Sequence, residues 1–266
     1  MTSTGTRPDV ERSDRLRQVA VTLAELFCVI GTLVGVGVIG TRVEESSGGA
    51  LAADATLLAP AGPAFSIWSV IYLGLLGYTV WQWLPEQATD RRHRATGWLA
   101  AASMVLNALW LLVTQQGWIW VSVGVIAALV VTLGLLVRRL TENPSYGTPE
   151  TVLVDGTFGL YLGWVAVATC ANVTAAFVAS GVDPGPTVAA ALGVAVLAVA
   201  AWVGRELALR LDGRWAVAVA MAWGLGWIAY GRAAAEPRSV VVGLAALVAA
   251  LVVLSAAAKV QRDRAV

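Results

Sequence analysis

Apolar residues gather into eight blocks that short polar segments separate along the chain. A helix rises 1.5 Å per residue and needs about 20 residues to cross the hydrocarbon core of a bilayer, and each block is close to that length. The pattern therefore predicts an all-α, polytopic bundle with eight transmembrane helices. The expected spans are residues 18–40, 64–83, 97–114, 118–137, 151–179, 187–204, 215–231 and 239–258.

Composition supports a membrane protein. Hydrophobic residues make up 58% of the 266 residues and charged residues only 13%, whereas soluble domains have about 45–50% and about 25%. This excludes a water-soluble enzyme fold, and the ten-residue alternation of outer-membrane barrels is absent from the sequence. The first block is longer than the apolar region of a signal peptide, so we expect it to be a mature span. Gly31 and Gly35 have the small-xxx-small spacing of closely packed helices.

The basic residues are divided unequally between the two sides of the membrane. Of the 18 Lys and Arg residues, 15 lie in the terminal segments or in the polar segments on the same side, and only Arg42, Arg232 and Arg238 lie on the other side. Cytoplasmic segments carry the excess of Lys and Arg. We therefore expect a multi-pass protein of the cytoplasmic membrane with both termini in the cytoplasm.

Several kinds of chemistry lack the residues that they need. The single histidine, His93, is expected in a polar loop and the single lysine, Lys259, in the C-terminal tail. This excludes an intramembrane Schiff base, a bis-histidine haem site and a histidine metal site. Cys28 and Cys170 lie in apolar blocks, where a thiol behaves as a small hydrophobe. Because no nucleophile, base and orienting group stand together, we expect no enzyme activity, no metal and no covalent cofactor. Dispersed basic residues and a net charge of +1 indicate no nucleic-acid partner.

The fifth block carries polar and aromatic residues on one helical face. Trp164, Ala168 and Asn172 follow one another at i, i+4 and i+8, which places them in line. The small side chain of Ala168 leaves a dent between two larger groups. This face is a candidate wall of a ligand pocket.

The second and third blocks bring similar groups to a similar depth. They contribute Trp68 and Tyr72, and Asn107 and Trp110. A mostly apolar wall with a few polar groups is typical of ligand pockets, and the loop at residues 41–63 is the natural lid. The alternative is that the indoles fill a bundle core and the amides join one helix to another.

Three motifs resemble those of a known family. Residues 68–72 read Trp-Ser-Val-Ile-Tyr and are followed by Gly-Tyr at 77–78 and Trp81, like the W-x-x-x-Y…G…W signature of the tryptophan-rich sensory protein family (TspO/MBR), which includes the mitochondrial translocator protein. Residues 106–110 are similar to its L-N-x-x-W, and residues 161–172 to its Y-L-x-W-x-x-x-A-T-x-x-N. The motifs lie in the family's order on the second, third and fifth blocks.

The resemblance implies a non-covalent site for tetrapyrroles such as protoporphyrin or haem-like molecules, in a protein that acts as sensor, carrier or regulator. Tyr72 is added to the site by its depth alone. By the resemblance, the pocket residues are Trp68, Asn107, Trp110, Trp118, Trp164, Ala168 and Asn172.

The sequence also departs from the family's pattern. The proline-rich lid is reduced to Pro60 and Pro63, and Ser122 stands where an acidic residue is common early in the fourth helix. We divide the chain into an N-terminal arm (1–17), a five-helix unit (18–179), three additional helices (180–258) and a tail (259–266). The additional helices contain no internal acid, amide or base, so we expect them to be scaffold.

Two acidic residues, Glu25 and Asp155, lie well inside predicted spans. A charge at the bilayer centre costs at least about 2.5–3.5 kcal/mol, so each must be sheltered. The two carboxyls are expected to snorkel, stay protonated or face each other; for Asp155, a solvated position at a helix start is the alternative. The pair suggests a second function, a proton-coupled transporter of small solutes, and a third is a structural scaffold without ligand. The expected partners are the bilayer and a hydrophobic small molecule, and the sequence leaves a homodimer open.

Overall fold

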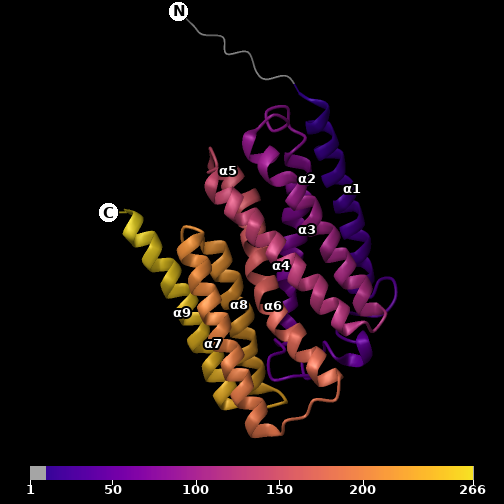
Figure 1. Ribbon diagram of the computed structural model, residues 1–266, viewed down its shortest axis with the longest axis vertical. Coiled ribbons are helices and arrows are strands. Elements are labelled where there is room, and N and C mark those ends of the chain that lie inside the picture. Colours follow the sequence, from indigo (N-terminus) through magenta and orange to yellow (C-terminus); the bar gives the residue numbers. More distant parts are fainter. Residues whose placement is uncertain (1–9, 266) are drawn as a thin grey trace, which may run out of the picture.

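The computed structural model describes residues 10–265, which form eight long helices without strands (Figure 1). Four short helical turns lie between them. The long helices are α1 (Arg12–Gly35), α2 (Ile67–Trp81), α3 (Arg91–Gln115), α4 (Ile119–Glu142), α6 (Thr157–Ala179), α7 (Pro186–Arg210), α8 (Trp215–Ala234) and α9 (Val240–Ala265). The short turns are η1 (Ser47–Gly49), η2 (Gly62–Ser66), α5 (Thr148–Glu150) and the π-helical η3 (Thr151–Gly156).

Seven helical segments in the described part of the chain are long and apolar enough to cross a membrane. One of them runs continuously from α5 through η3 to α6. The exception is α8, a 20-residue helix whose three tryptophans, three glycines and Arg232 lower its mean hydropathy. The expected class, a polytopic helical bundle, is confirmed.

The helices continue beyond the apolar blocks that predicted them. The expected N-terminal arm is helical from Arg12 onward, while residues 1–9 lie outside the described residues, and the expected tail is helical as far as Ala265. A hydropathy pattern marks only the length inside hydrocarbon, whereas backbone hydrogen bonding continues until a cap or a break in the sequence. At the start of α1, Glu11 and Asp14 form a capping box that fixes the first turn.

His93 is not in a loop as expected. It lies in the first turns of α3, only 1% exposed, because the N-cap side chain of Asp90 starts that helix ahead of the apolar block by accepting from the Arg92 backbone N–H at 2.7 Å.

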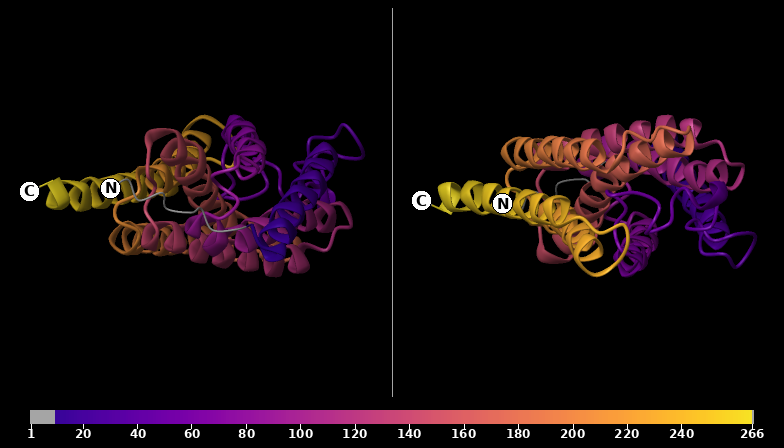
Figure 2. Two further views of the ribbon diagram at one scale, coloured as in Figure 1. Left: turned by 90° about the horizontal axis from the view of Figure 1, so that it is seen from above. Right: turned by 90° about the horizontal axis from the view of Figure 1, so that it is seen from below.

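Each helix of the bundle packs on its neighbours in an order that differs from the order along the chain. The most extensive contacts follow the path α1–α3–α4–α6–α8–α9–α7, and α2 touches α1 and α6 (Figure 2). The three additional helices therefore join the five-helix unit mainly through α8 on α6.

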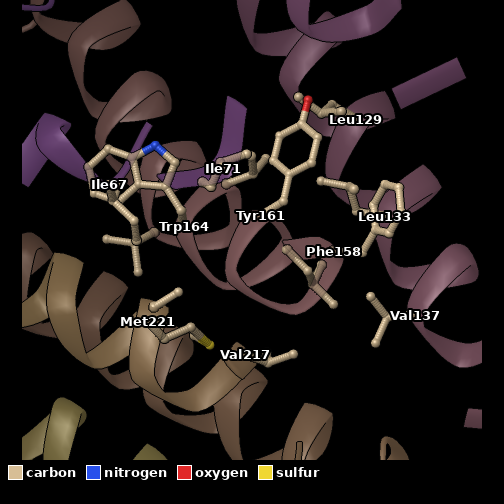
Figure 3. Packing of buried hydrophobic residues seen from close by; sticks show 14 of the residues in the cluster. Ile67, Ile71, Leu129, Leu133, Val137, Phe158, Tyr161, Trp164, Val217 and Met221 are labelled. Atoms are coloured by element: carbon tan, nitrogen blue, oxygen red, sulfur yellow. The ribbon is translucent and has the colours of Figure 1, made fainter. Parts of the chain in front are cut away.

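Glycines permit the closest helix contacts. A Cβ at Gly31 would lie 2.9 Å from the Ala108 Cα on α3, which confirms the close packing expected for this part of α1. On α6, a Cβ at Gly163 would lie 2.8 Å from the Ala220 Cβ on α8. The buried core is continuous across this join, since Val217 and Met221 of α8 lie beneath the aromatic residues of α6 (Figure 3).

Candidate functional site

A cavity of about 310 Å³ lies where the C-terminal end of α1, the loop that follows it, η2, α2 and α3 meet. We call residues 41–63 the covering loop. The wall of the cavity is mostly apolar and aromatic, with one basic and one acidic side chain from this loop. Its lining residues are Thr32, Gly35, Val36, Arg42, Val43, Glu44, Phe65, Trp68, Ser69, Tyr72, Trp110 and Leu111.

Trp68 is the central ring of an aromatic cluster at this cavity. Its indole stacks on Tyr72 with 5.1 Å between ring centroids, and it meets Tyr161 and Trp164 edge-on at 5.7 and 6.2 Å. Phe65 also packs edge-on against Trp164 at 5.7 Å. These arrangements are the favourable ones for aromatic pairs and hold the rings at fixed angles.

A second cavity of about 30 Å³ lies deeper in the five-helix unit. It shares Phe65, Trp68 and Trp110 with the larger cavity, so these three rings separate the two spaces. Trp164 lines the smaller cavity, and its buried Nε1 has no hydrogen-bond acceptor within the described residues. The other residues of its wall are Asn107, Ile126, Leu129, Val165 and Ala168.

Buried amides fix the aromatic residues from behind. The Trp110 Nε1 donates to the Asn172 Oδ1 at 2.7 Å, and the Asn172 Nδ2 donates to the Ser122 Oγ at 3.0 Å. Ser122 therefore serves as the partner of Asn172. It completes a link between α3, α4 and α6.

Asn107 makes a similar link between α1, α2 and α3. Its Nδ2 lies 3.1 Å from the Tyr72 Oη and 3.4 Å from the Cys28 Sγ. The amides thus join helices, as the core-filling alternative supposed, and at the same time fix side chains that line a cavity.

The structure brings together most of the residues that the sequence singled out. Trp68, Tyr72 and Trp110 line the larger cavity, while Asn107, Trp164 and Ala168 line the smaller one together with Trp68 and Trp110. Asn172 lies behind Trp110. Trp118 lines neither cavity: it precedes α4 and is 59% exposed, as in an interfacial belt.

Phe65 lines both cavities but was not expected from the sequence. Its position just after Pro63, in the short turn that leads into the tryptophan motif, was the available signal. Arg42 was counted only as a loop charge, because its proximity to the aromatic cluster depends on the path of the covering loop.

The two intramembrane acids do not face each other. Glu25 is 3% exposed, and its Oε2 has no hydrogen-bond partner among the described residues. Asp155 is buried as well and accepts from Arg92 and from Arg214, which immediately precedes α8. The expectation of a solvated carboxylate at a helix start was wrong for Asp155. It lies in the π-helical turn η3 and is sheltered by two arginines that are distant in sequence.

The additional helices do contain a buried base, contrary to expectation. Arg232 belongs to α8 and is 1% exposed. In the sequence it lies one residue beyond the apolar block, where a charge is normally solvated. The tertiary structure instead covers it with the loop that precedes α2, through contacts to the carbonyls of Thr56 and Ala53.

Comparison with known proteins agrees with this arrangement. A family model described as TSPO-like protein matches residues 20–258, a range that includes the additional helices as well as the five-helix unit. None of the curated proteins and none of the solved structures gives a match. A family match over most of the chain, on a helical membrane bundle, establishes that this chain belongs to the TSPO-like protein family.

Proposed function

We propose that this TSPO-like membrane protein binds a flat, largely apolar small molecule of the tetrapyrrole class and acts as a sensor, carrier or regulator without catalysing a reaction. The observation that carries the proposal is the 310 Å³ cavity with Phe65, Trp68, Tyr72 and Trp110 in its wall. Aromatic faces stack on flat conjugated rings, and a few polar groups set the ligand's orientation.

The size of the cavity suggests how such a ligand would bind. Ligand pockets have volumes of about 300–1,000 Å³, so this cavity is at the lower end of the range. We expect a tetrapyrrole to enter with one edge and to keep the opposite edge against the covering loop. Rotation of the Trp68 or Trp110 ring would join the larger cavity to the smaller one and extend the space.

The charged residues of the cavity wall indicate where an anionic group would lie. Arg42 and Glu44 both line it, and none of the ion pairs within the described part of the chain includes Arg42. Its guanidinium is therefore available to a carboxylate, which it can bind through two N–H donors. A porphyrin with free carboxylates fits this wall better than its neutral ester.

Fluorescence titration of the purified protein tests the proposal. Protoporphyrin IX should quench tryptophan fluorescence saturably, its dimethyl ester should bind more weakly, and an unrelated flat dye should be weaker still. Arg42→Gln should remove most of the preference for the free acid, whereas the matched variant Glu44→Gln should keep or increase it. Absence of saturable quenching by any porphyrin or by haem would overturn the proposal.

We also propose the cytoplasmic membrane as the location, with both termini in the cytoplasm. The support is the 15 to 3 distribution of basic residues. The three outlying arginines, Arg42, Arg232 and Arg238, lie in or beside the connections at the ends of α1 and α8.

A second candidate function rests on Glu25. A buried carboxyl oxygen without a partner is costly inside a membrane and favours a role in proton movement. Asp155 supports this function less, because two arginines already pair with it. Proton-gradient-driven solute uptake that disappears in Glu25→Gln, in a protein that does not bind porphyrin, would favour the transporter.

A further inference from the structure

The covering loop is fastened to α8, a helix outside the five-helix unit. Arg232 donates from Nη1 to the Thr56 carbonyl at 2.8 Å and from Nη2 to the Ala53 carbonyl at 3.1 Å. The planar guanidinium can bind two separate carbonyls at once, which a lysine ammonium does less well. One side chain thus holds two turns of the loop.

Two further contacts continue this attachment toward the cavity. The Trp223 Nε1 donates to the Ala64 carbonyl at 2.9 Å, and the backbone N–H of Ala61 donates to the Trp227 carbonyl at 3.3 Å. Ala64 is fully buried and directly precedes Phe65, which lines both cavities. The position of the Phe65 ring therefore depends on α8.

The Arg232 side chain that attaches the loop is buried. Arg232 is 1% exposed, and burying a guanidinium in an apolar bundle is costly unless its N–H groups find acceptors. The two loop carbonyls supply acceptors. Hydrogen bonds from a charged donor are among the stronger ones, so the attached state is favoured.

The opposite end of α8 is fastened to the five-helix unit too. Arg214, directly before α8, contacts Asp155 and donates from Nε to the Thr141 Oγ1 at 2.8 Å. Between these ends, α8 packs along α6 through the close contact at Gly163. The helix is thus fixed along its length and can serve as a firm support for the loop.

We propose that Arg232 and Trp223 are positioning residues that hold the covering loop and η2 against the cavity, so that the three additional helices set how readily a ligand enters and leaves. The attachment of the loop follows from its contacts alone, whereas its effect on ligand entry and release rests on the proposed function.

Hydrogen–deuterium exchange of the full chain without ligand tests whether Arg232 and Trp223 hold the covering loop in place. The backbone N–H groups of Ala59, Ala61 and Ala64 are hydrogen-bonded and report on this segment. Arg232→Gln should speed their exchange by about tenfold or more, because hydrogen bonds from a charged donor are among the stronger ones. Arg238→Gln is the matched control: this exposed arginine pairs with Glu236, away from the loop carbonyls, and its loss should leave the loop unchanged.

A second pair of variants keeps the test decisive where Arg232→Gln does not fold. Trp223→Phe keeps an aromatic ring but loses the N–H donor to Ala64, and should speed exchange around η2. Trp215→Phe on the same helix, where the indole is 47% exposed, should not. Arg232→Lys keeps the charge but lacks the planar fork that reaches both carbonyls. It should fall between wild type and Arg232→Gln, a rescue that general loss of packing would not give.

The dissociation rate of protoporphyrin IX, measured by stopped flow, tests whether the attachment of the loop controls ligand release. Arg232→Gln should release it several-fold faster than wild type and Arg238→Gln. If wild type binds no porphyrin, the proposed function fails while the exchange result still judges the attachment. If the loop amides exchange at the wild-type rate in both Arg232→Gln and Trp223→Phe, the positioning role is overturned. If they exchange faster but the dissociation rate of protoporphyrin IX is unchanged, the link between the attachment and ligand release is overturned.

Discussion

Replacing Ala168 with phenylalanine should fill the smaller cavity. Ala168 lines it together with Trp68, Trp110 and Trp164. The cavity volume is about 30 Å³, about two to three times the roughly 10–15 Å³ that one water molecule needs. A phenyl ring needs several times that space, so the new side chain must push against the rings that separate the two cavities.

Two measurable effects follow from this overfilling. Overpacking a well-packed core costs about 1–3 kcal/mol, so we expect a lower free energy of unfolding in detergent. The displaced Trp68 and Trp110 rings would also narrow the larger cavity, and we expect protoporphyrin IX to bind at least about tenfold more weakly, a change of about 1.4 kcal/mol in binding free energy. Ala168→Ser adds a single oxygen atom, which the cavity can hold, and should stay close to wild type in both measurements.

The assays are thermal unfolding and porphyrin titration of the same preparations. Val178→Phe is a suitable control, because Val178 is on the same helix but 48% exposed and lines neither cavity. Wild-type porphyrin affinity in a destabilised Ala168→Phe would refute the placement of the binding site. Unchanged stability of Ala168→Phe would instead refute the reasoning from the cavity volume.

Three further predictions concern the rest of the bundle. Asp155→Asn removes the carboxylate that buried Arg92 shares with the partly buried Arg214, while Glu150 remains beside Arg92. It should cost about 3 kcal/mol of unfolding free energy, the lower end of the range for a broken buried pair. Glu206→Gln, in an exposed pair, should cost no more than about 1 kcal/mol; equal losses in thermal unfolding would contradict this. Gly163→Val should destabilise the join of α6 and α8 by about 1–3 kcal/mol. Gly134→Val should not, because Gly134 faces open space. Similar thermal unfolding midpoints for the two variants would show that the join tolerates a side chain. Reporter fusions at the C-terminus and after α4 should both read as cytoplasmic, and a C-terminal reporter on the opposite side would disprove the orientation inferred from charge.

The sequence alone determined the class of the protein, the number of long helices and the core of the candidate site. Hydrophobic blocks of membrane-crossing length leave few alternatives to helices, because every backbone polar group in lipid must be satisfied within its own segment. Spacing along a helix placed Trp164, Ala168 and Asn172 on one face. In the structure Trp164 and Ala168 line a cavity, and Asn172 fixes Trp110 in its wall. These inferences are local, and helical periodicity is sufficient for them.

Where each helix begins and ends was less well determined. The polar residues that start α1 and α3 and those that end α9 do not differ in composition from loop residues. Their helical state follows from capping groups and from contacts with neighbouring helices. For this reason His93 was expected in a loop but is buried in a helix.

Only the tertiary structure decided which distant residues meet. Asp155 and Arg232 are charged residues near the ends of apolar blocks, a position that normally means solvent. Asp155 is buried because Arg92 and Arg214 converge on it, and Arg232 because the covering loop folds back over α8. Such contacts join segments between 59 and 179 residues apart, and hydropathy carries no information over that separation. The packing of α8 on α6, which close glycine contacts permit, makes both burials possible and connects the additional helices to the cavity.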